Sequence, residues 1–252
     1  MKRGLSPGLV LAVLLAGCSS KKHAKQEIPP LLPPEAPAAT AGQASEAPSA
    51  AGTTVPHRDG TTLTSIPQNA PVLYSESGTA SWYGPPYHNR PGANGEVYDM
   101  NALTAAHKTL PLNSLVRVTN VTTGNSTIVR ITDRGPFIGD RIIDLSLAAA
   151  KAVDVWRSGT ALVKVDVLSA PAPIATGGRW AVQIGAFQSR RTAAELKSKL
   201  MRRYHTAQVL QFTGPTGEWV RVRVQDDDKR RAQELAQATV TPEGGIFLVR
   251  LD

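Results

Sequence analysis

Aromatic residues are confined to the later part of this 252-residue chain. The first is Tyr74, and all four tryptophans, five tyrosines and four phenylalanines lie at or beyond it. A segment of about seventy residues without an aromatic ring buries too little apolar surface to build a core. Folding is therefore expected to begin near residue 72. The 41% hydrophobic content predicts one or two globular domains and excludes collagen, wholesale disorder and a multi-span membrane protein.

Residues 1–17 have the pattern of an export signal. Lys2 and Arg3 precede the apolar run 9–16, which is far shorter than the roughly twenty residues of a membrane-spanning helix. The run ends in Leu15-Ala16-Gly17-Cys18, which resembles the bacterial lipoprotein box. We therefore expect acylation of Cys18, palmitate included, and a firm membrane anchor. An ordinary secretory signal with an accidental cysteine is the alternative.

Ser19 follows the cysteine, where an aspartate would favour retention at the inner membrane. This predicts an outer-membrane lipoprotein that faces the periplasm, or one anchored to the cell membrane if the cell has no outer membrane. Residues 18–71 are Pro- and Ala-rich without an apolar period, and predict a disordered tether. Extended polyproline at about 3.1 Å per residue would let it reach on the order of 100 Å.

The cysteine and histidine content argues against a metal centre. A single cysteine allows neither an internal disulfide framework nor a Cys-rich zinc site. His88 and His107 lack a cysteine partner or a paired-ligand spacing. We therefore expect no metal and no cofactor.

Residues 72–170 alternate as short strands. The segments 114–119 and 126–132 flank Thr123-Gly124-Asn125, a hairpin signal. Asp144-Leu145-Ser146 precedes one short capped helix at 147–153, and 161–168 is a further strand. Many strands, little helix and frequent glycine predict a small closed barrel. Residues 171–178 are expected to link it to a second block.

Residues 179–252 contain a half-repeat with a shift of 39. The shift places Trp180 on Trp219, and Ala193 and Leu196 on Ala232 and Leu235. Each half is typical of a strand followed by a helix, with helices starting near Ser189 and near residues 226–228. Added strands at 207–212 and 245–251 predict a ferredoxin-like βαββαβ arrangement, a four-stranded sheet with two helices on one face.

The second block is also the most basic part of the chain. Residues 171–252 carry thirteen basic and eight acidic groups. An anionic partner and a merely solvated basic face are both compatible with this charge. A four-stranded sheet with two helices also suggests RNA binding. The chain lacks the paired aromatic motifs of RNA-binding domains and carries an export signal, so we expect no nucleic acid.

Four strings in the barrel block carry the functional signal. They are Ala80-Ser81-Trp82-Tyr83-Gly84, Ala93-Asn94-Gly95-Glu96, Leu103-Thr104-Ala105-Ala106-His107-Lys108-Thr109-Leu110-Pro111 and Asp133-Arg134-Gly135-Pro136-Phe137. Their order and spacing resemble the six-stranded double-psi β-barrel of the rare lipoprotein A family, the septal-ring lytic transglycosylases. Residues 179–252 likewise resemble a SPOR domain, a peptidoglycan-binding module, through the strands at 180–187 and 219–224.

The resemblance implies an endolytic lyase of peptidoglycan in septal wall remodelling and daughter-cell separation. The bond cut would join N-acetylmuramic acid to N-acetylglucosamine, leaving 1,6-anhydro ends without consuming water. The substrate would be denuded glycan strands, which implies cooperation with amidases that remove stem peptides. A non-catalytic, expansin-like wall-loosening lipoprotein is the alternative, because fold does not determine chemistry.

Asp133 is the catalytic residue that the resemblance implies. When the substrate's own C6 hydroxyl attacks, one carboxylate can act first as acid and then as base, where ordinary glycosidases need two. Strand alternation predicts that Val129, Ile131 and Asp133 share one apolar face, so burial should raise the pKa of Asp133. A carboxylate that caps the turn before Gly135 is the structural alternative.

Other residues match the family motifs at the same site. Glu96 and His107 are expected to orient Asp133 or bind acetamido groups, and Asn94 and Arg134 to contact substrate. At most one of Trp82 and Tyr83 can line the groove, because neighbours on a strand point to opposite faces. Gly92 stands where the family usually has a basic residue or threonine, which leaves this loop's contacts open.

In the SPOR block, the resemblance assigns glycan binding to the face of the sheet without helices. The residues expected there are Gln183, Trp219, Arg221 and Arg223. Arg221 and Arg223 alternate with Val220, Val222 and Val224, which predicts an exposed arginine face opposite an apolar one. A charged but unoccupied face is the alternative.

Overall fold

The computed structural model describes residues 70–214 and 216–252. The predicted export signal, Cys18 and the tether up to residue 69 lie outside the described residues. Within the described part of the chain, no helix has the length and apolarity needed to cross a membrane.

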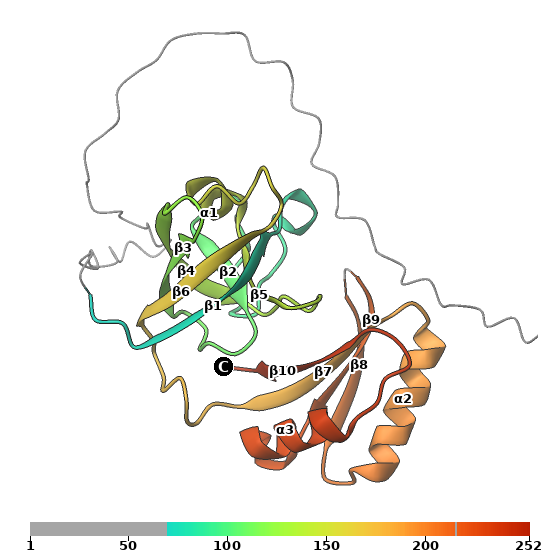
Figure 1. The fold of residues 1–252 in the computed structure, drawn as a ribbon. Coiled ribbons are helices and arrows are strands. Elements are labelled where there is room, and N and C mark those ends of the chain that lie inside the picture. Colours follow the sequence, from blue (N-terminus) through green and yellow to red (C-terminus); the bar gives the residue numbers. More distant parts are fainter. Residues whose placement is uncertain (1–69, 215) are drawn as a thin grey trace, which may run out of the picture. The chain divides into compact units, whose positions relative to one another are not determined.

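The first folded part is a closed barrel of six strands in the order β1-β5-β2-β4-β3-β6 (Figure 1). This confirms the predicted small barrel, with β3 and β4 forming the expected antiparallel hairpin. The elements are β1 (Tyr74–Trp82), the 3-10 turn η1 (Pro85–Tyr87), β2 (Thr104–His107), β3 (Leu115–Asn120), β4 (Ser126–Asp133), β5 (Arg141–Leu145), α1 (Leu147–Ala152) and β6 (Ala161–Ser169).

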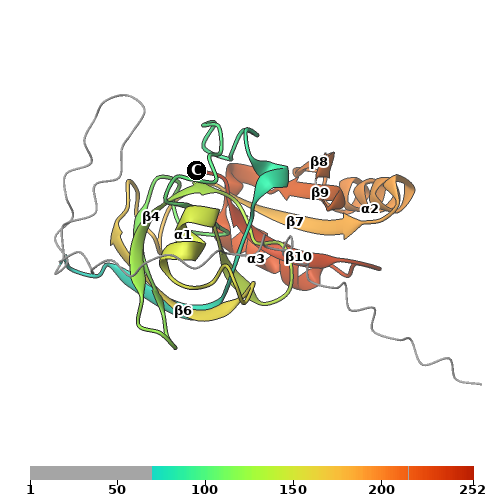
Figure 2. The ribbon, with the colours of Figure 1, turned by 90° about the horizontal axis from the view of Figure 1, so that it is seen from above.

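Inward-facing side chains of the strands form the barrel core, and α1 closes one end of it (Figure 2). Ser146 caps the helix, because its Oγ accepts a hydrogen bond of 3.2 Å from the amide of Ala149. Ala149 and Ala150 pack into the core without exposed surface. The strand residues buried with them include Ala80, Ala105, Val129, Ile131, Ile143 and Leu145.

A bulge in β4 changes the direction of its last residue. Strand β2 runs parallel to β4, with Ala105 opposite Ile131 but Ala106 opposite Asp133, so the register steps over Thr132. One extra residue reverses the alternation beyond it. The prediction that Asp133 continues the row of Val129 and Ile131 was therefore wrong. Asp133 instead shares the outward face of Ala106.

The second folded part is a four-stranded sheet in the order β10-β7-β9-β8, with two helices on one face (Figure 1). This confirms the predicted ferredoxin-like arrangement. Its elements are β7 (Trp180–Phe187), α2 (Arg190–Arg203), β8 (Gln208–Gly214), β9 (Gly217–Arg223), the 3-10 turn η2 (Gln225–Asp227), α3 (Lys229–Ala238) and β10 (Gly245–Arg250). Ser189 and Asp228 cap the two helices through their side-chain oxygens.

The half-repeat holds for the helices and fails for the tryptophans. Ala193 and Ala232 are buried at matching positions between helix and sheet, as are Leu196 and Leu235. Trp180 belongs to this core, whereas Trp219 precedes the core residue Val220 and so faces the other side of the sheet. The two tryptophans are also 39 positions apart, but their indoles lie on opposite faces of the sheet.

Candidate active site

Four side chains form a row across the outside of the barrel. Ser81 on β1 pairs with Asp144 on β5, Asp144 pairs with Ala106 on β2, and Ala106 pairs with Asp133 on β4. The neighbouring residues of these strands lie in the core, so alternation turns the row outward. Two strand spacings of about 4.8 Å place the two aspartate Cα atoms roughly 10 Å apart. Two carboxylates thus flank the small side chain of Ala106.

Asp133 combines burial with two backbone hydrogen bonds. Its Oδ1 accepts from the amide of Arg134 at 2.7 Å and from that of Ala93 at 3.0 Å. Oδ2 accepts no hydrogen bond within the described residues. Burial raises the pKa of Asp133, and the two amide bonds partly offset that rise. The carboxylate therefore both caps its turn and has a free oxygen with raised proton affinity.

Asp144 is the functional candidate that sequence reasoning missed. Burial raises its pKa to about 6 despite a guanidinium beside it. Its Oδ2 accepts from Arg141 at 3.1 Å, and Arg141 also donates to Ser81 at 3.1 Å. Its Oδ1 is buried without a hydrogen-bond partner. The signal in the sequence was an acidic residue between the strand residues Ile143 and Leu145, in a segment for which no site role was predicted.

Tyrosine rings cover the side of this row near β1. Tyr83 donates from its amide to Leu145 at 3.0 Å, which fixes it beside the end of β5. Its ring stacks on Tyr98 with centroids 4.3 Å apart and meets Tyr87 edge-on at 5.8 Å. Burial raises the pKa of Tyr83 strongly, and Asp133 and Asp144 raise it further. Trp82 packs against the barrel core, so of the adjacent pair Tyr83 lies at the carboxylates.

Glu96 is held by a partner that the sequence did not reveal. Arg130 donates to its two carboxylate oxygens at 2.9 and 2.6 Å, a bidentate pair. Asn113 Oδ1 accepts from Arg130 at 3.0 Å and from Asn94 at 3.3 Å. The loop that carries Glu96 also donates to Asp133 through the amide of Ala93. The connection between Glu96 and Asp133 is therefore indirect and runs through the backbone of this loop.

Gly92 lets this loop lie close to the β4 bulge. A Cβ atom at Gly92 would lie 3.1 Å from the carbonyl oxygen of Thr132, tighter than an ordinary contact. The amide of Asn94 donates to that same oxygen at 3.1 Å. Gly92, which departs from the pattern that the resemblance implies, thus allows the loop to pack against the strand that ends in Asp133.

His107 and Arg134 both stabilise the turn after β2 instead of pointing at the carboxylates. His107 follows Ala106, so it faces the opposite side of the strand, and its side chain is only 3% exposed. Its Nε2 lies 2.8 Å from Glu76, and its Nδ1 accepts from the amides of Thr109 and Leu110. Arg134 donates to the carbonyls of His107 and Leu110 at 3.1 and 2.6 Å.

The helix-free face of the second sheet is more engaged than expected. Arg221 donates twice to Gln183 Oε1, at 3.1 and 2.7 Å, and its guanidinium lies 5.1 Å from the Phe212 ring centroid. Arg223 pairs with Asp227 at 2.6 Å. Both arginines are half-buried, and neither is a bare charge.

Trp219 lies against glycines of neighbouring strands on the same face. A Cβ atom at Gly185 or Gly214 would come within 2.7 or 2.9 Å of the indole, so only glycine leaves room for it. Phe247 lies 6.4 Å from the indole, centroid to centroid. Sequence reasoning missed Phe212 and Phe247, which the alternation of their strands could have placed on this face.

The described residues contain no group of three or more histidine, cysteine or acidic side chains able to hold a metal ion. The site instead consists of two proton-binding carboxylates, tyrosine rings and a clamped loop.

Comparison with known proteins matches both folded parts. The description "Lytic transglycolase" matches residues 75–165, and "SPOR domain" matches residues 176–246. An endolytic peptidoglycan transglycosylase RlpA of Pseudomonas aeruginosa (strain UCBPP-PA14) is 41% identical over 188 residues, which cover 73% of this chain and 53% of that protein. An RlpA of Helicobacter pylori (strain ATCC 700392 / 26695) is 44% identical over 151 residues, 49% of this chain and 48% of that protein.

The chain belongs to the RlpA family.

The chain spans about half the length of the RlpA proteins that it matches. Both aspartates, Glu96 and Tyr83 lie inside the segment matched as a lytic transglycolase domain. Among solved structures, the apo-expansin of Clavibacter michiganensis aligns with a TM-score of 0.33 at 16% identity, over 61% of this chain and 81% of that chain. That likeness is too slight to carry an argument.

Proposed function

We propose that this RlpA-family chain is a lytic transglycosylase. It cleaves the β-1,4 bond between N-acetylmuramic acid and N-acetylglucosamine in denuded glycan strands. The observation that carries the proposal is the outward pair of Asp133 and Asp144, two carboxylates with raised pKa on either side of Ala106. Perturbed carboxylates at one site are typical of acid–base catalysis.

Asp133 supplies the proton transfers. Its protonated carboxyl gives a proton to the glycosidic oxygen as the bond from that oxygen to C1 of the muramic residue breaks. The C6 hydroxyl oxygen of the same residue then bonds to C1, and its proton passes to the Asp133 carboxylate. The 1,6-anhydro ring forms, the acid is regenerated, and no water is consumed. The free Oδ2 of Asp133 is the atom available for both transfers.

Asp144 supplies negative charge. Above its pKa of about 6 it is ionised, with one oxygen on Arg141 and the other without a partner. An anionic oxygen in a poorly solvated place stabilises the positive charge that develops on the sugar ring in the transition state. Asp133 thus carries both proton transfers, which ordinary glycosidases divide between two acids, and Asp144 contributes charge alone.

The cellular setting is part of the proposal. An acylated Cys18 would anchor the protein in the outer membrane, facing the periplasm, and the tether would let it reach the septal wall. The SPOR sheet would hold denuded glycan that amidases produce, through sugar contacts of Trp219, Gln183, Arg221 and Arg223. These features are supported by the sequence motifs and by the SPOR match of residues 176–246.

Asp133→Asn and Asp144→Asn test the chemistry, with release of anhydro-muramic ends from denuded glycan measured by mass spectrometry. Loss of the acid–base group should lower turnover by roughly a hundredfold or more. The Asp144 variant should also lose at least tenfold, because one charge interaction is removed. Melting temperatures should stay constant or rise, because each change removes a poorly solvated charge.

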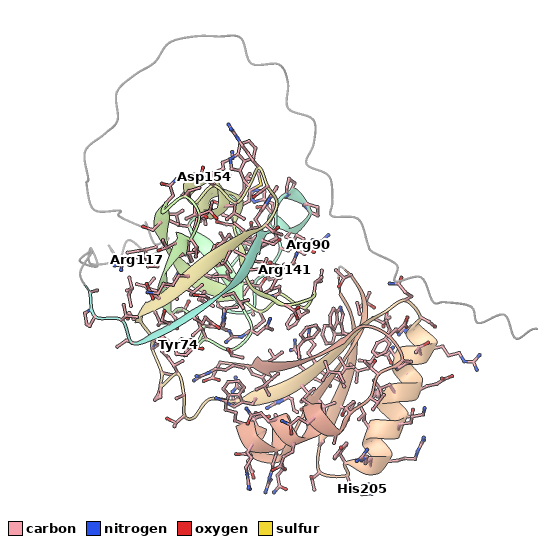
Figure 3. All side chains as sticks on the ribbon, viewed as in Figure 1. Tyr74, Arg90, Arg117, Arg141, Asp154 and His205 are labelled. Carbon is pink, nitrogen blue, oxygen red and sulfur yellow. The ribbon has the colours of Figure 1, made fainter. Side chains whose placement is uncertain are left out.

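Asp154→Asn is the matched control. Asp154 lies at the α1 end of the barrel, away from Arg90 and Arg141 (Figure 3), and pairs with Asn125. This variant should keep wild-type turnover. Near-normal release by Asp133→Asn, with stability lowered by about 1 kcal/mol, would make Asp133 a turn cap and leave the expansin-like binder as the better account.

A further inference from the structure

The cations around the two carboxylates are almost all committed to partners. Arg130 is paired with Glu96, and Arg141 with Asp144. Arg134 donates to the turn after β2, and Lys108 Nζ donates to the carbonyl of Arg141 at 2.5 Å. The side chains of these four residues are therefore already held in place by bonds within the protein.

Arg90 differs from them. Its side chain is exposed, and its guanidinium makes no hydrogen bond or ion pair with any residue in 70–214 or 216–252. The backbone around it is fixed: the amide of Arg90 donates to the carbonyl of Tyr87, and the amide of Tyr98 donates to the carbonyl of Arg90 at 2.8 Å. An unpaired cation on a fixed backbone is positioned to receive an anion.

The aromatic cluster places Arg90 at the rim of the carboxylate row. Tyr98, paired with Arg90, stacks on Tyr83, which is bonded to the end of β5 beside Asp144. Figure 3 shows Arg90 and Arg141 on the same side of the barrel. The pKa of Tyr87 is affected by both the acids and the cations of this region. Burial raises this pKa, and Asp144 and Asp133 raise it further. Arg90 and Arg141 lower it.

The substrate class supplies an anion that this site must accommodate. Each muramic residue carries a lactyl ether whose carboxylate is free when the stem peptide is absent and becomes a neutral amide when the peptide is attached. A free carboxylate that approaches two acids is repelled unless a cation lies close. Guanidinium is suited to this role because its fork of donors matches a carboxylate.

We propose that Arg90 binds the free lactyl carboxylate of muramic acid, so that the barrel itself selects glycan from which the peptide has been removed. This rests on the proposed lytic activity and extends it, because selection of denuded glycan would then not depend on the SPOR sheet alone. Arg90 is a specificity-determining residue at the rim of the site and takes no part in the proton transfers.

The test compares two forms of one substrate with the complete chain. Denuded glycan strands are used as they are, or after carbodiimide coupling to methylamine, which turns each lactyl carboxylate into a neutral amide. The rate of anhydro-end release is measured on both by mass spectrometry. The wild type should act about tenfold faster on the free acid, equivalent to about 1.4 kcal/mol, and salt should reduce this preference.

Arg90→Ala should bring the ratio of the two rates close to one, and Arg90→Lys should restore part of the preference. Arg117→Ala removes the same charge on the opposite side of the barrel (Figure 3) and should keep the wild-type ratio. Thermal melts should show the Arg90 variants folded, since the Arg90 side chain has no partner to lose among residues 70–214 and 216–252. Because the Arg117 charge acts on Asp166, the same melts check that the control variant is folded.

Two results would overturn the proposal alone: a wild type indifferent to amidation, or an Arg90→Ala variant with the wild-type ratio, while anhydro ends are still released. No release from either substrate by the wild type would overturn the proposed function, and this proposal with it.

Discussion

The barrel and the four-stranded sheet differ in how fully their charged side chains are paired. At the barrel row, Asp133 and Asp144 are largely buried, their pKa values are raised, and each keeps one oxygen without a bond from the described residues. On β9 of the sheet, Arg221 is bonded to Gln183 and Arg223 to Asp227. The first arrangement leaves a carboxylate oxygen of each group without a partner in the described part of the chain. The second holds each guanidinium through hydrogen bonds to a neighbouring side chain, although burial lowers the pKa of Arg221.

This difference in pairing corresponds to the different demands of proton transfer and of binding. A group that must gain and lose a proton near neutral pH needs an environment that disfavours its charge. A surface that only binds sugars needs donors and rings in fixed positions, and internal pairs supply that rigidity. This physical difference supports the proposal that the barrel is the reactive part and the sheet the binding part.

Besides the aspartate variants, the largest expected effect is on the loop that joins Glu96 to Asp133. Glu96→Gln replaces a charge-assisted bidentate pair with Arg130 by weaker hydrogen bonds. The loop should then hold the Ala93 amide less firmly against Asp133, and anhydro-end release should fall about tenfold. Arg130→Lys should lower it similarly, since one ammonium cannot form two parallel bonds. Wild-type turnover in both would show that the loop does not position Asp133.

The binding side of the comparison is tested by Arg221→Ala combined with Arg223→Ala. Loss of both guanidinium groups should weaken sedimentation with amidase-treated sacculi several-fold, and untreated sacculi should bind less than treated ones in the wild type. Stability should fall by about 1 kcal/mol or less, because these pairs are partly solvated. The matched control is Arg191→Ala on α2, where the side chain is 87% exposed on the helix face. Equal sedimentation of treated and untreated sacculi would remove the specificity claim.

The smallest expected effect is on the pH dependence of the protein's stability. The pKa of Asp144 is raised to about 6 in the folded protein, so the folded state binds more protons than the unfolded state between about pH 4 and 6. Stability contributed by the protonated group is therefore lost as pH rises through that window. The melting temperature of Asp144→Asn should not show this part of the fall with rising pH, and at pH 7 it should be higher than that of the wild type. Parallel curves for the two proteins would contradict the raised pKa.

Much of the fold could be predicted because its signals are local. Alternation at 114–132 around Gly124 predicted the β3–β4 hairpin, and the Ser146 and Ser189 caps marked helix starts that the structure confirms. The aromatic boundary at Tyr74 coincides with the first residue of β1. The hairpin and the caps depend on residues within a few positions of one another, where chain geometry alone limits the outcome. Asp133 was a candidate for another reason, the resemblance to a family through four strings spread over residues 80–137.

Only the tertiary structure decided what surrounds those residues. The β4 bulge at Thr132 reverses the face of Asp133, and strand order brings Asp144 to the other side of Ala106. The partner of Glu96 is Arg130, thirty-four positions away, and the side chain of His107 faces the barrel interior. Sequence determined which residues are chemically able to act, because that is a property of each side chain. Burial, pairing and a free oxygen are properties of neighbours, which exist only once the strands have closed into a barrel.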